Sequence, residues 1–304
     1  MPEKARTMED HLVDEIQRTG YPLEIEISEL LDQNWHVFNN QPYLDEDENK
    51  TREIDIYASH KNVKAQISEK TNILVSTDIV LECKKSNTHA WVFFTRPRLE
   101  RLGFGQDQTT DFLEAWSKGK KKFLDRLPLP FDLHYNTPSR IAYTYAEVKL
   151  RGDSSGRGES SEREIFEASN QLMKYAAYDI NQRQEKMRDN SSGRDVVFLF
   201  LAIVLDGLIY EATSKKGIIK LRERSRIILR STRYSKSKAG MSRYNIDVVT
   251  RSYFPQYIKM IDDEVNSILS LFISSDEYLI QIANSDVVEL LGNVKRTAHG
   301  SSLP

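Results

Sequence analysis

Apolar residues recur in several segments of the chain with the period of an α-helix. In the clearest segment, Leu23, Ile27 and Leu31 fall on one helical face, and Pro22 suits the first turn of the helix. The same spacing of three and four residues predicts further helices. The expected helical ranges are residues 1–18, 22–34, 162–187 and 255–273.

Shorter segments alternate or concentrate apolar residues as strands do. Ile54 and Ile56 alternate around Asp55, and an apolar run at 79–81 directly precedes Glu82. The expected strands are residues 35–38, 52–59, 77–85, 91–94, 196–205, 218–231 and 246–250. Strands and helices in this order predict an α/β fold, in which a central mixed β-sheet is flanked by helices.

The composition is that of an ordinary globular protein. The 304 residues are 39% hydrophobic and 29% charged, with a net charge of -2, so any nucleic-acid partner must be bound by a local patch. The single cysteine, Cys83, excludes an intrachain disulfide and a cysteine-based zinc site. The longest apolar run, 196–205, is too short to span a bilayer, and the charged N-terminus lacks the apolar core of a signal peptide. These features predict a cytoplasmic protein without membrane contact.

Asp55, Glu82 and Lys84 are the candidate catalytic residues. Side chains alternate between the faces of a strand, so Glu82 and Lys84 project together, while Cys83 points away and leaves its carbonyl near the same edge. If the two strands are neighbours, Asp55 converges on this pair. Two carboxylates and a carbonyl are hard oxygen ligands that suit Mg²⁺ or Mn²⁺. Such a metal stabilises phosphate charge and lowers the pKa of a bound water, and Lys84 adds a cation that can orient or help deprotonate that water.

A solvated strand face is the ordinary explanation for charges at this spacing, because Asp and Glu-x-Lys combinations arise by chance in charged proteins. Both carboxylates, however, interrupt apolar sequence, where an unpaired charge is costly. A metal site therefore explains the cluster better. The helix at 22–34 offers a third acid, because Glu24 and Glu26 flank its apolar stripe, whereas Glu29 points away from it.

The arrangement resembles the PD-(D/E)xK nuclease superfamily, which has the restriction-endonuclease-like fold. The matching segments are TGYPLE at 19–24, REIDIYA at 52–58 and IVLECKKS at 79–86. Their order, a helix acid followed by a strand Asp and a strand Glu-x-Lys, is the order of the family. Ile54 stands where the family usually has proline, a replacement that is common in the superfamily.

The resemblance implies a role for each residue of the cluster. Asp55 and Glu82 are expected to bind the metal, together with the backbone carbonyl of Cys83. Glu24 is selected as the helix acid, which reaches the metal directly or through a water. Lys84 is the expected catalytic lysine.

Gln171 and Tyr175 form a fourth matching element. The segment QLMKY at 171–175 fits a Q-x-x-x-Y motif that lies on a helix in RecB-like members of the superfamily. The two residues are one helical turn apart and face the same way. In those relatives they lie beside the active site and contact substrate or the catalytic lysine. The alternative is a chance pair on an amphipathic helix.

The resemblance also predicts the domain organisation, since it covers about 19–95 and 162–205. The segment 97–160 departs from a minimal core and suggests an insertion. We expect one nuclease domain over 1–304, with its core at about 19–95 and 162–251, an insertion at 97–160 and a C-terminal helical part at 252–304.

A basic segment at 215–251 is the candidate nucleic-acid surface. It holds twelve Lys and Arg residues against two acids, Glu223 and Asp247, and an excess of ten charges suits a phosphate backbone. The alternative is the solvated face of edge strands, where cations prevent aggregation. The residues predicted to bind nucleic acid are Arg222, Arg224, Arg226, Arg230, Arg233, Lys236 and Lys238.

These features predict a nuclease that uses Mg²⁺ or Mn²⁺ to hydrolyse DNA, as an endonuclease rather than an exonuclease. Phage defence or DNA processing is the expected setting. RNA is not excluded, because the metal chemistry is shared. The alternative function is a catalytically inactive nuclease fold that binds nucleic acid or protein. The sequence leaves open a homo-oligomer or a partner subunit.

Overall fold

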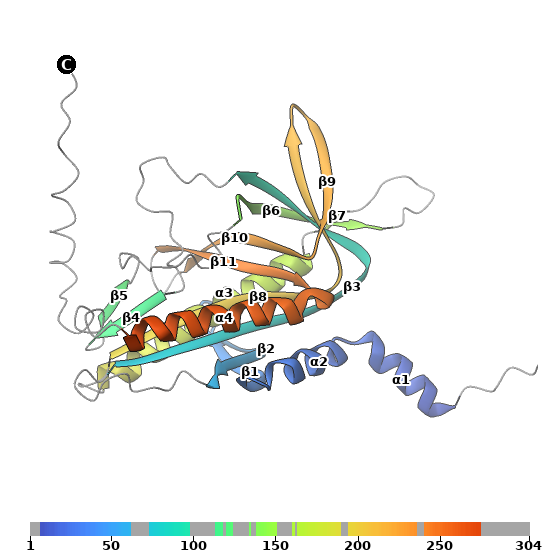
Figure 1. Ribbon diagram of the computed structural model, residues 1–304. Helices are drawn as coiled ribbons and strands as arrows, with labels where there is room; N and C mark the ends of the chain where they lie inside the picture. Colours follow the sequence, from blue (N-terminus) through green and yellow to red (C-terminus); the bar gives the residue numbers. More distant parts are fainter. Residues whose placement is uncertain are drawn as a thin grey trace, which may run out of the picture.

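The computed structural model describes residues 7–61, 73–97, 113–117, 120–123, 134, 138–150, 160–161, 163–189, 194–235 and 240–274. These parts of the chain form an α/β fold with one large mixed sheet (Figure 1). The helices are α1 (Met8–Arg18), α2 (Tyr21–Leu31), α3 (Arg163–Asp189) and α4 (Phe254–Ser274), with a 3-10 turn, η2 (Arg251–Tyr253), before α4. The strands are β1 (Trp35–Asp45), β2 (Lys50–His60), β3 (Ile73–Pro97), β4 (Leu113–Ser117), β5 (Lys120–Phe123), β6 (Arg140–Lys149), β7 (Ser160–Ser161), β8 (Arg194–Lys215), β9 (Ile218–Arg224), β10 (Arg226–Ser235) and β11 (Gly240–Thr250).

The sheet is mixed and partly closed on itself. Its order is β1-β2-β3-β6-β10-β11-β8-β4-β5, with β7 beside β6 and β9 beside β8. Strand β3 also pairs in parallel with β8, so five strands, β3, β6, β10, β11 and β8, close into a ring. The two longest strands of the chain thus lie side by side in the middle of the molecule.

Local sequence explains the helix boundaries near the N-terminus. Thr7 and Asp10 form a reciprocal capping box that starts α1. Pro22 lies in the first turn of α2, where its missing N–H costs nothing. Leu23 and Ile27 of α2 are buried in the hydrophobic core, as their spacing predicts.

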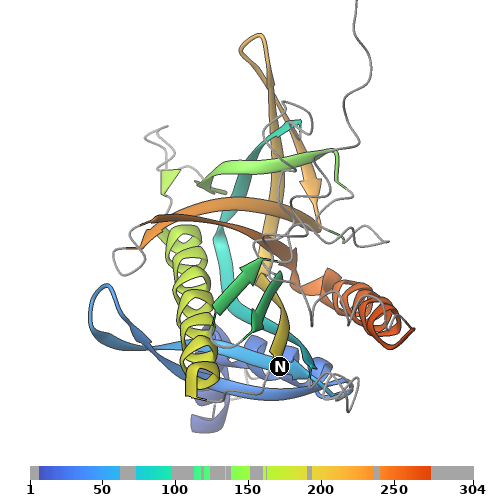
Figure 2. The same cartoon turned by 90° about the vertical axis from the view of Figure 1, so that its left-hand side faces the viewer.

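The helices cover opposite faces of the sheet, as a pair of residues in β2 demonstrates. Tyr57 packs against Tyr175 of α3, whereas His60 lies 3.6 Å from Asp262 of α4. Residues an odd number of positions apart on a strand face opposite ways. Helix α3 and helix α4 therefore lie on different sides of the sheet (Figure 2).

A close approach of two backbones marks the middle of β3 and β8. Their register shifts between Lys85 and Ala90. Gly207 of β8 lies there, and a Cβ added to it would be 2.8 Å from the carbonyl oxygen of Ser86. Only glycine fits this contact without a shift of the backbone.

The expected helices and strands are confirmed within the described residues, but two strand divisions differ, and β4, β5, β6 and β7 were not expected. The segments 77–85 and 91–94 are parts of one strand, β3, because the irregularity at Lys85 bends the strand without ending it. The segment 218–231 is two strands, β9 and β10, separated at Ser225. Strand β6, which lies within 97–160, is a member of the central sheet. The helical tail expected after residue 274 lies outside the described residues.

None of the described helices is both long and apolar enough to cross a membrane. The restriction-endonuclease-like identity of the core stays a prediction.

Candidate active site

Asp55, Glu82 and Lys84 lie together on the neighbouring strands β2 and β3. The antiparallel register pairs Ile56 with Leu81, which brings Asp55 and Glu82 across from each other. Lys84 Nζ donates to Glu82 Oε2 at 2.6 Å and lies 3.5 Å from Asp55 Oδ2. The structure thus brings together the three residues that the sequence selected from two separate strands.

The backbone holds Asp55 in place. The N–H of Cys83 donates to Asp55 Oδ2 at 2.7 Å, so one carboxylate oxygen is bound across the strand pair. The Asp55 side chain stays 22% exposed. The Cys83 side chain is buried, and burial raises the pKa of its thiol well above the usual value, with the nearby carboxylates adding to the effect. Cys83 therefore contributes through its backbone and not as a thiolate.

Glu82 is the most unusual group of the site. It has no exposed surface, and its Oε1 has no hydrogen-bond partner among the described residues. Burial raises the pKa of Glu82 to about 8, because the attraction of Lys84 offsets only part of the desolvation cost. Native proteins rarely leave a buried polar atom unpaired, so this oxygen is a candidate ligand atom.

Lys84 neutralises the two acids. Burial alone would lower the pKa of its ammonium, but the attraction of Glu82 and Asp55 outweighs burial and raises that pKa above its usual value. Lys84 is therefore a cation at neutral pH, poised between two carboxylates.

Helix α2 supplies Glu24 to the same region. Burial raises the pKa of Glu24, the negative charge of Asp55 raises it further, and the positive charge of Lys84 lowers it. These couplings show that Glu24 is near both residues. Glu26 is placed differently, because both of its carboxylate oxygens accept hydrogen bonds from Arg251.

Gln171 and Tyr175 of α3 lie above β2. Gln171 Nε2 donates to the carbonyl oxygen of Glu53 at 3.2 Å, two residues before Asp55 in the strand. Tyr175 is buried, and its ring packs against Tyr57 at 5.9 Å between centroids, in a cluster with other tyrosines of β1 and α3. The structure thus places Gln171 beside the strand of the site and Tyr175 in an aromatic part of the core.

Glu164, at the start of α3, is an acid that sequence reasoning missed. Burial raises its pKa, the charge of Glu147 raises it further, and His89 and Lys84 lower it. Its coupling to Lys84 places Glu164 near the candidate site. No local pattern in the sequence marks this residue, because its approach to Lys84 depends on where α3 docks.

The fit of these residues to a metal rests on their donor atoms. Within the described residues, no group of three His, Cys, Asp or Glu side chains is set to hold a metal ion. Magnesium does not require such a cage, because it commonly takes one or two carboxylates and keeps several waters. Asp55 and Glu82, with the unpaired Glu82 Oε1, supply oxygen ligands of this kind. The residues therefore fit Mg²⁺ or Mn²⁺.

Most described arginines of the predicted nucleic-acid surface bind partners within the protein. Arg224 donates to Glu211 at 2.8 Å through Nε, Arg226 to Asp247 at 2.9 Å and Arg230 to Asn245 at 3.0 Å. Such guanidinium groups have fewer donors left for phosphate. Arg222 is exposed, and Lys236 and Lys238 lie outside the described residues.

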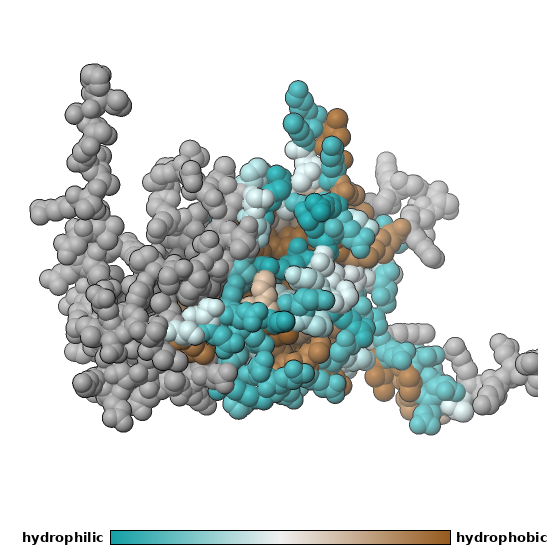
Figure 3. Space-filling model, in the orientation of Figure 1, coloured by the Kyte–Doolittle hydropathy of each residue, from teal (hydrophilic) through white to brown (hydrophobic). Residues whose placement is uncertain are grey.

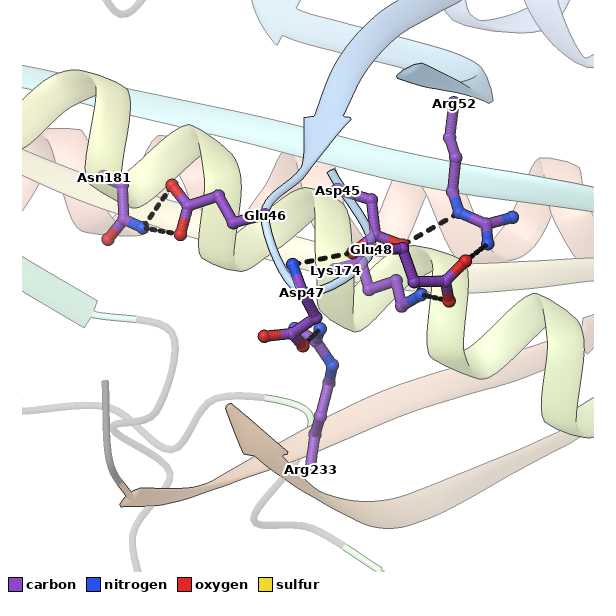
Figure 4. A network of polar contacts seen from close by, with 8 residues as sticks. All are labelled: Asp45, Glu46, Asp47, Glu48, Arg52, Lys174, Asn181 and Arg233. Carbon is purple, nitrogen blue, oxygen red and sulfur yellow. Dashed lines mark hydrogen bonds and ion pairs between the residues drawn. The ribbon is translucent and has the colours of Figure 1, made fainter. Parts of the chain in front are cut away.

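Arg233 belongs to a network around the β1–β2 turn (Figure 4). It forms an ion pair with Asp47, while Lys174 of α3 binds Asp45 and Glu48. Arg52 bridges the same two acids, Asp45 at 2.9 Å and Glu48 at 2.5 Å. The acidic turn is thus tied to α3 and to β10, which holds the β1–β2 hairpin that carries Asp55.

Comparison of the chain with known proteins found no match to a family model, to a curated protein or to a solved structure.

Proposed function

We propose that the protein is a Mg²⁺-dependent nuclease with a restriction-endonuclease-like core, and that it hydrolyses phosphodiester bonds of DNA. The supporting observation is the buried carboxylate of Glu82, whose Oε1 is unpaired, beside Asp55 and the Lys84 ammonium. An unpaired oxygen is not by itself the mark of a ligand, because Asp78 Oδ1 is also unpaired among the described residues, although Arg183 binds its other oxygen. Glu82 differs from Asp78 in its position, because it lies beside the partly exposed Asp55 and shares Lys84 with it.

In this proposal, Asp55, Glu82 and the carbonyl of Cys83 would hold the metal, and Glu24 would bind it through a water. When bound, Mg²⁺ supplies positive charge to the phosphate and makes an attacking water more acidic. The N–H of Cys83 orients Asp55 by its hydrogen bond at 2.7 Å. The site therefore has one acid fixed by the backbone and one acid fixed by burial.

Lys84 is a cation that the strand places on the same side as Glu82. Its ammonium neutralises the two carboxylates in the protein alone, which makes their close approach tolerable. In the reaction it would turn to the phosphate and stabilise the charge that develops there, or orient the water. Lys84 therefore has to stay protonated, and its raised pKa keeps it so.

The substrate that we propose is DNA inside the cytoplasm, cut internally as an endonuclease would, in phage defence or DNA processing. The chemistry at the phosphate does not distinguish DNA from RNA, so the assay includes both. If the protein cleaves RNA and leaves DNA intact, the nuclease function is supported and RNA becomes the proposed substrate.

The test is cleavage of supercoiled plasmid, linear duplex and single-stranded RNA with Mg²⁺ or Mn²⁺. We expect wild-type protein to cut DNA, and Asp55→Ala and Lys84→Ala to lose at least about 100-fold in rate. Glu24→Ala and Glu29→Ala form a matched pair on α2, because Glu29 is exposed. Only the former should lose activity.

Two results would count against the proposal. Equal cleavage by wild type, Asp55→Ala and Lys84→Ala would place the activity elsewhere. Binding of DNA without cleavage by any of the proteins, in the presence of either metal, would favour the inactive nuclease fold that binds nucleic acid.

A further inference from the structure

Strands β8 and β9 form a hairpin arm, residues 209–224 (Figures 1 and 2). Residues 209–212 of β8 also pair with β3, so only residues 213–220 extend beyond the sheet as two strands. The arm is built of seven residue pairs, from Ile209 with Arg224 to Lys215 with Ile218. Lys216 and Gly217 close it with φ values of 52° and 79°. Two central residues with positive φ are typical of the type I′ turn, whose twist matches that of the strands. The arm is thus a regular ribbon up to its tip.

The two sides of the arm differ chemically, because residues alternate along each strand. Ile219 and Leu221 share one side, whereas Ile218, Lys220 and Arg222 share the other. Ile218, Ile219 and Leu221 are 65%, 58% and 59% exposed. Figure 3 shows hydrophobic and hydrophilic residues together on this projecting element. Apolar and basic side chains are therefore both exposed to solvent on the arm.

Four cations of the arm differ from the arginines at its base and beyond. Lys215, Lys216, Lys220 and Arg222 are exposed, and in the described part of the chain none of them forms an ion pair. Arg224, at the base, is bound to Glu211. Among the cations of the basic segment 215–251 whose side chains the structure describes, those that are exposed without an ion pair therefore lie on the arm.

Protection of an exposed edge explains only part of this composition. Within the described residues β9 pairs only with β8, and cations on such an edge discourage pairing with other chains. Edge protection does not account for three large apolar side chains that remain in water. Exposed apolar groups rimmed by charge mark a binding surface. Pairing of two arms would place like charges side by side, which is unfavourable.

We propose that the arm enters a groove of duplex DNA, with Lys216 and Lys220 on the phosphates and Ile218 and Ile219 against the sugar and base edges. The major groove, about 12 Å wide and about 8.5 Å deep, admits a two-stranded ribbon. The exposed tip, residues 213–221, is about 10 Å long at the rise of a strand.

The arm is connected directly to the candidate active site. Leu205 of β8 pairs with Lys84, and the arm begins four residues later. From Leu205 to Lys216 the strand covers at most about 36 Å. This path is close to one turn of duplex DNA, about 34 Å. A duplex held by the arm can therefore extend to Lys84. The choice of DNA as the ligand rests on the proposed nuclease function.

The experiment measures binding without cleavage, by fluorescence anisotropy of a labelled 20-base-pair duplex and of one of its single strands. All proteins carry Asp55→Ala, and EDTA is present. We expect Lys216→Gln/Lys220→Gln to weaken duplex binding about tenfold and to lower the slope of log affinity against log salt by about 2. Lys50→Gln/Lys259→Gln removes the same charge from exposed sites elsewhere and should change affinity less than twofold.

A second variant separates apolar from electrostatic contact. Ile218→Ser/Ile219→Ser should weaken duplex binding several-fold, leave the salt slope unchanged and hardly affect the single strand. Equal affinities for the two lysine variants would overturn the proposal, and so would equal losses on duplex and single strand. A change in sedimentation mass with unchanged DNA binding would instead assign the arm to a second copy of the chain.

The two proposals can be contradicted independently. If the arm variants lose duplex binding but the wild-type protein does not cleave, DNA binding by the arm is supported and the nuclease function is contradicted. If cleavage depends on Asp55 but the arm variants bind DNA normally, the nuclease function is supported and DNA binding by the arm is contradicted.

Discussion

Two acids buried in apolar strands, Glu82 in β3 and Asp247 in β11, are stabilised in opposite ways. Asp247 accepts from Arg226 at 2.9 Å and from Tyr257 at 3.1 Å, and His134 Nε2 lies 2.8 Å from it. Burial alone would raise the pKa of Asp247, but the charges of Arg226 and His134 lower it to about 2. Asp247 is therefore a fully paired structural anion.

Glu82 has fewer hydrogen-bond and ion-pair partners than Asp247. Lys84 binds one of its oxygens, the other has no partner among the described residues, and burial raises its pKa to about 8. Burial in an apolar strand is common to both acids, so burial does not distinguish a structural carboxylate from a ligand. Incomplete pairing separates Glu82 from Asp247 but also occurs at Asp78, so the position of Glu82 beside Asp55 and Lys84 completes the distinction.

The largest effect should follow removal of the structural acid. Asp247→Ala leaves His134 and Arg226 buried without their common partner, so we expect a loss of about 3–5 kcal/mol in the free energy of unfolding. Urea denaturation followed by circular dichroism measures it. Asp247→Asn, which keeps the volume, provides a folded variant with a smaller loss. A loss below about 1 kcal/mol in both would remove the contrast with Glu82.

The matching change at the other acid should act on function instead. Burial already favours the neutral form of Glu82, as its pKa of about 8 indicates, and Glu82→Gln keeps the side-chain volume. We therefore expect the free energy of unfolding to change by less than about 1 kcal/mol or to rise. Cleavage should fall at least about 100-fold in the same protein. Strong destabilisation by Glu82→Gln would make Glu82 a structural residue like Asp247.

The pH dependence of stability sharpens the same comparison. The pKa of Asp247 is lower in the folded protein than its usual value of 3.8, so its stabilisation is present above that value and is lost as the pH falls toward about 2. His134 has a raised pKa, despite its burial, because Asp247 and Glu264 attract its charged form. Its contribution is therefore present below its usual pKa of 6.5 and is lost as the pH rises through the folded value.

We expect wild-type protein to unfold with decreasing pH below about 4, and Asp247→Asn to lose this acid transition. Thermal denaturation in buffers between pH 2 and pH 9 provides the measurement, with both proteins scanned at the same ionic strength. Identical acid transitions in the two proteins would show that other carboxyl groups control the acid limit.

The smallest effects are expected on α3. Gln171→Ala removes one hydrogen bond to the strand of Asp55, worth about 1 kcal/mol, and should lower cleavage several-fold. Tyr175→Phe keeps the packed ring and should change the cleavage rate less than twofold. The comparison of the two single variants in the plasmid assay tests this ranking. A larger loss in Tyr175→Phe would show that its hydroxyl group acts on the substrate, as the resemblance implies.

Short-range patterns were enough to predict most of the elements. Helix α2 has Pro22 and its apolar stripe, and β2 alternates Ile54 and Ile56 around Asp55. The continuity of β3 through its irregularity was not predictable in the same way, because β3 pairs there with β8, which is far away in sequence. The alternation of residues in 218–231 likewise suggested one strand, although Ser225 divides it between β9 and β10.

The residue types of the candidate site can be recognised along the chain, because Asp55, Glu82 and Lys84 carry their chemistry and their strand periodicity locally. The assembled fold set their partners, because pairing of charges is a long-range property. It paired Lys84 with Glu82, left Glu82 Oε1 unsatisfied and satisfied Asp247 through residues from other elements. It also engaged Arg224 and Arg226 internally, while the arm cations at Lys216 and Lys220 stayed exposed. Charge counted along a chain cannot distinguish these outcomes, since solvation and partners arise only when the strands assemble.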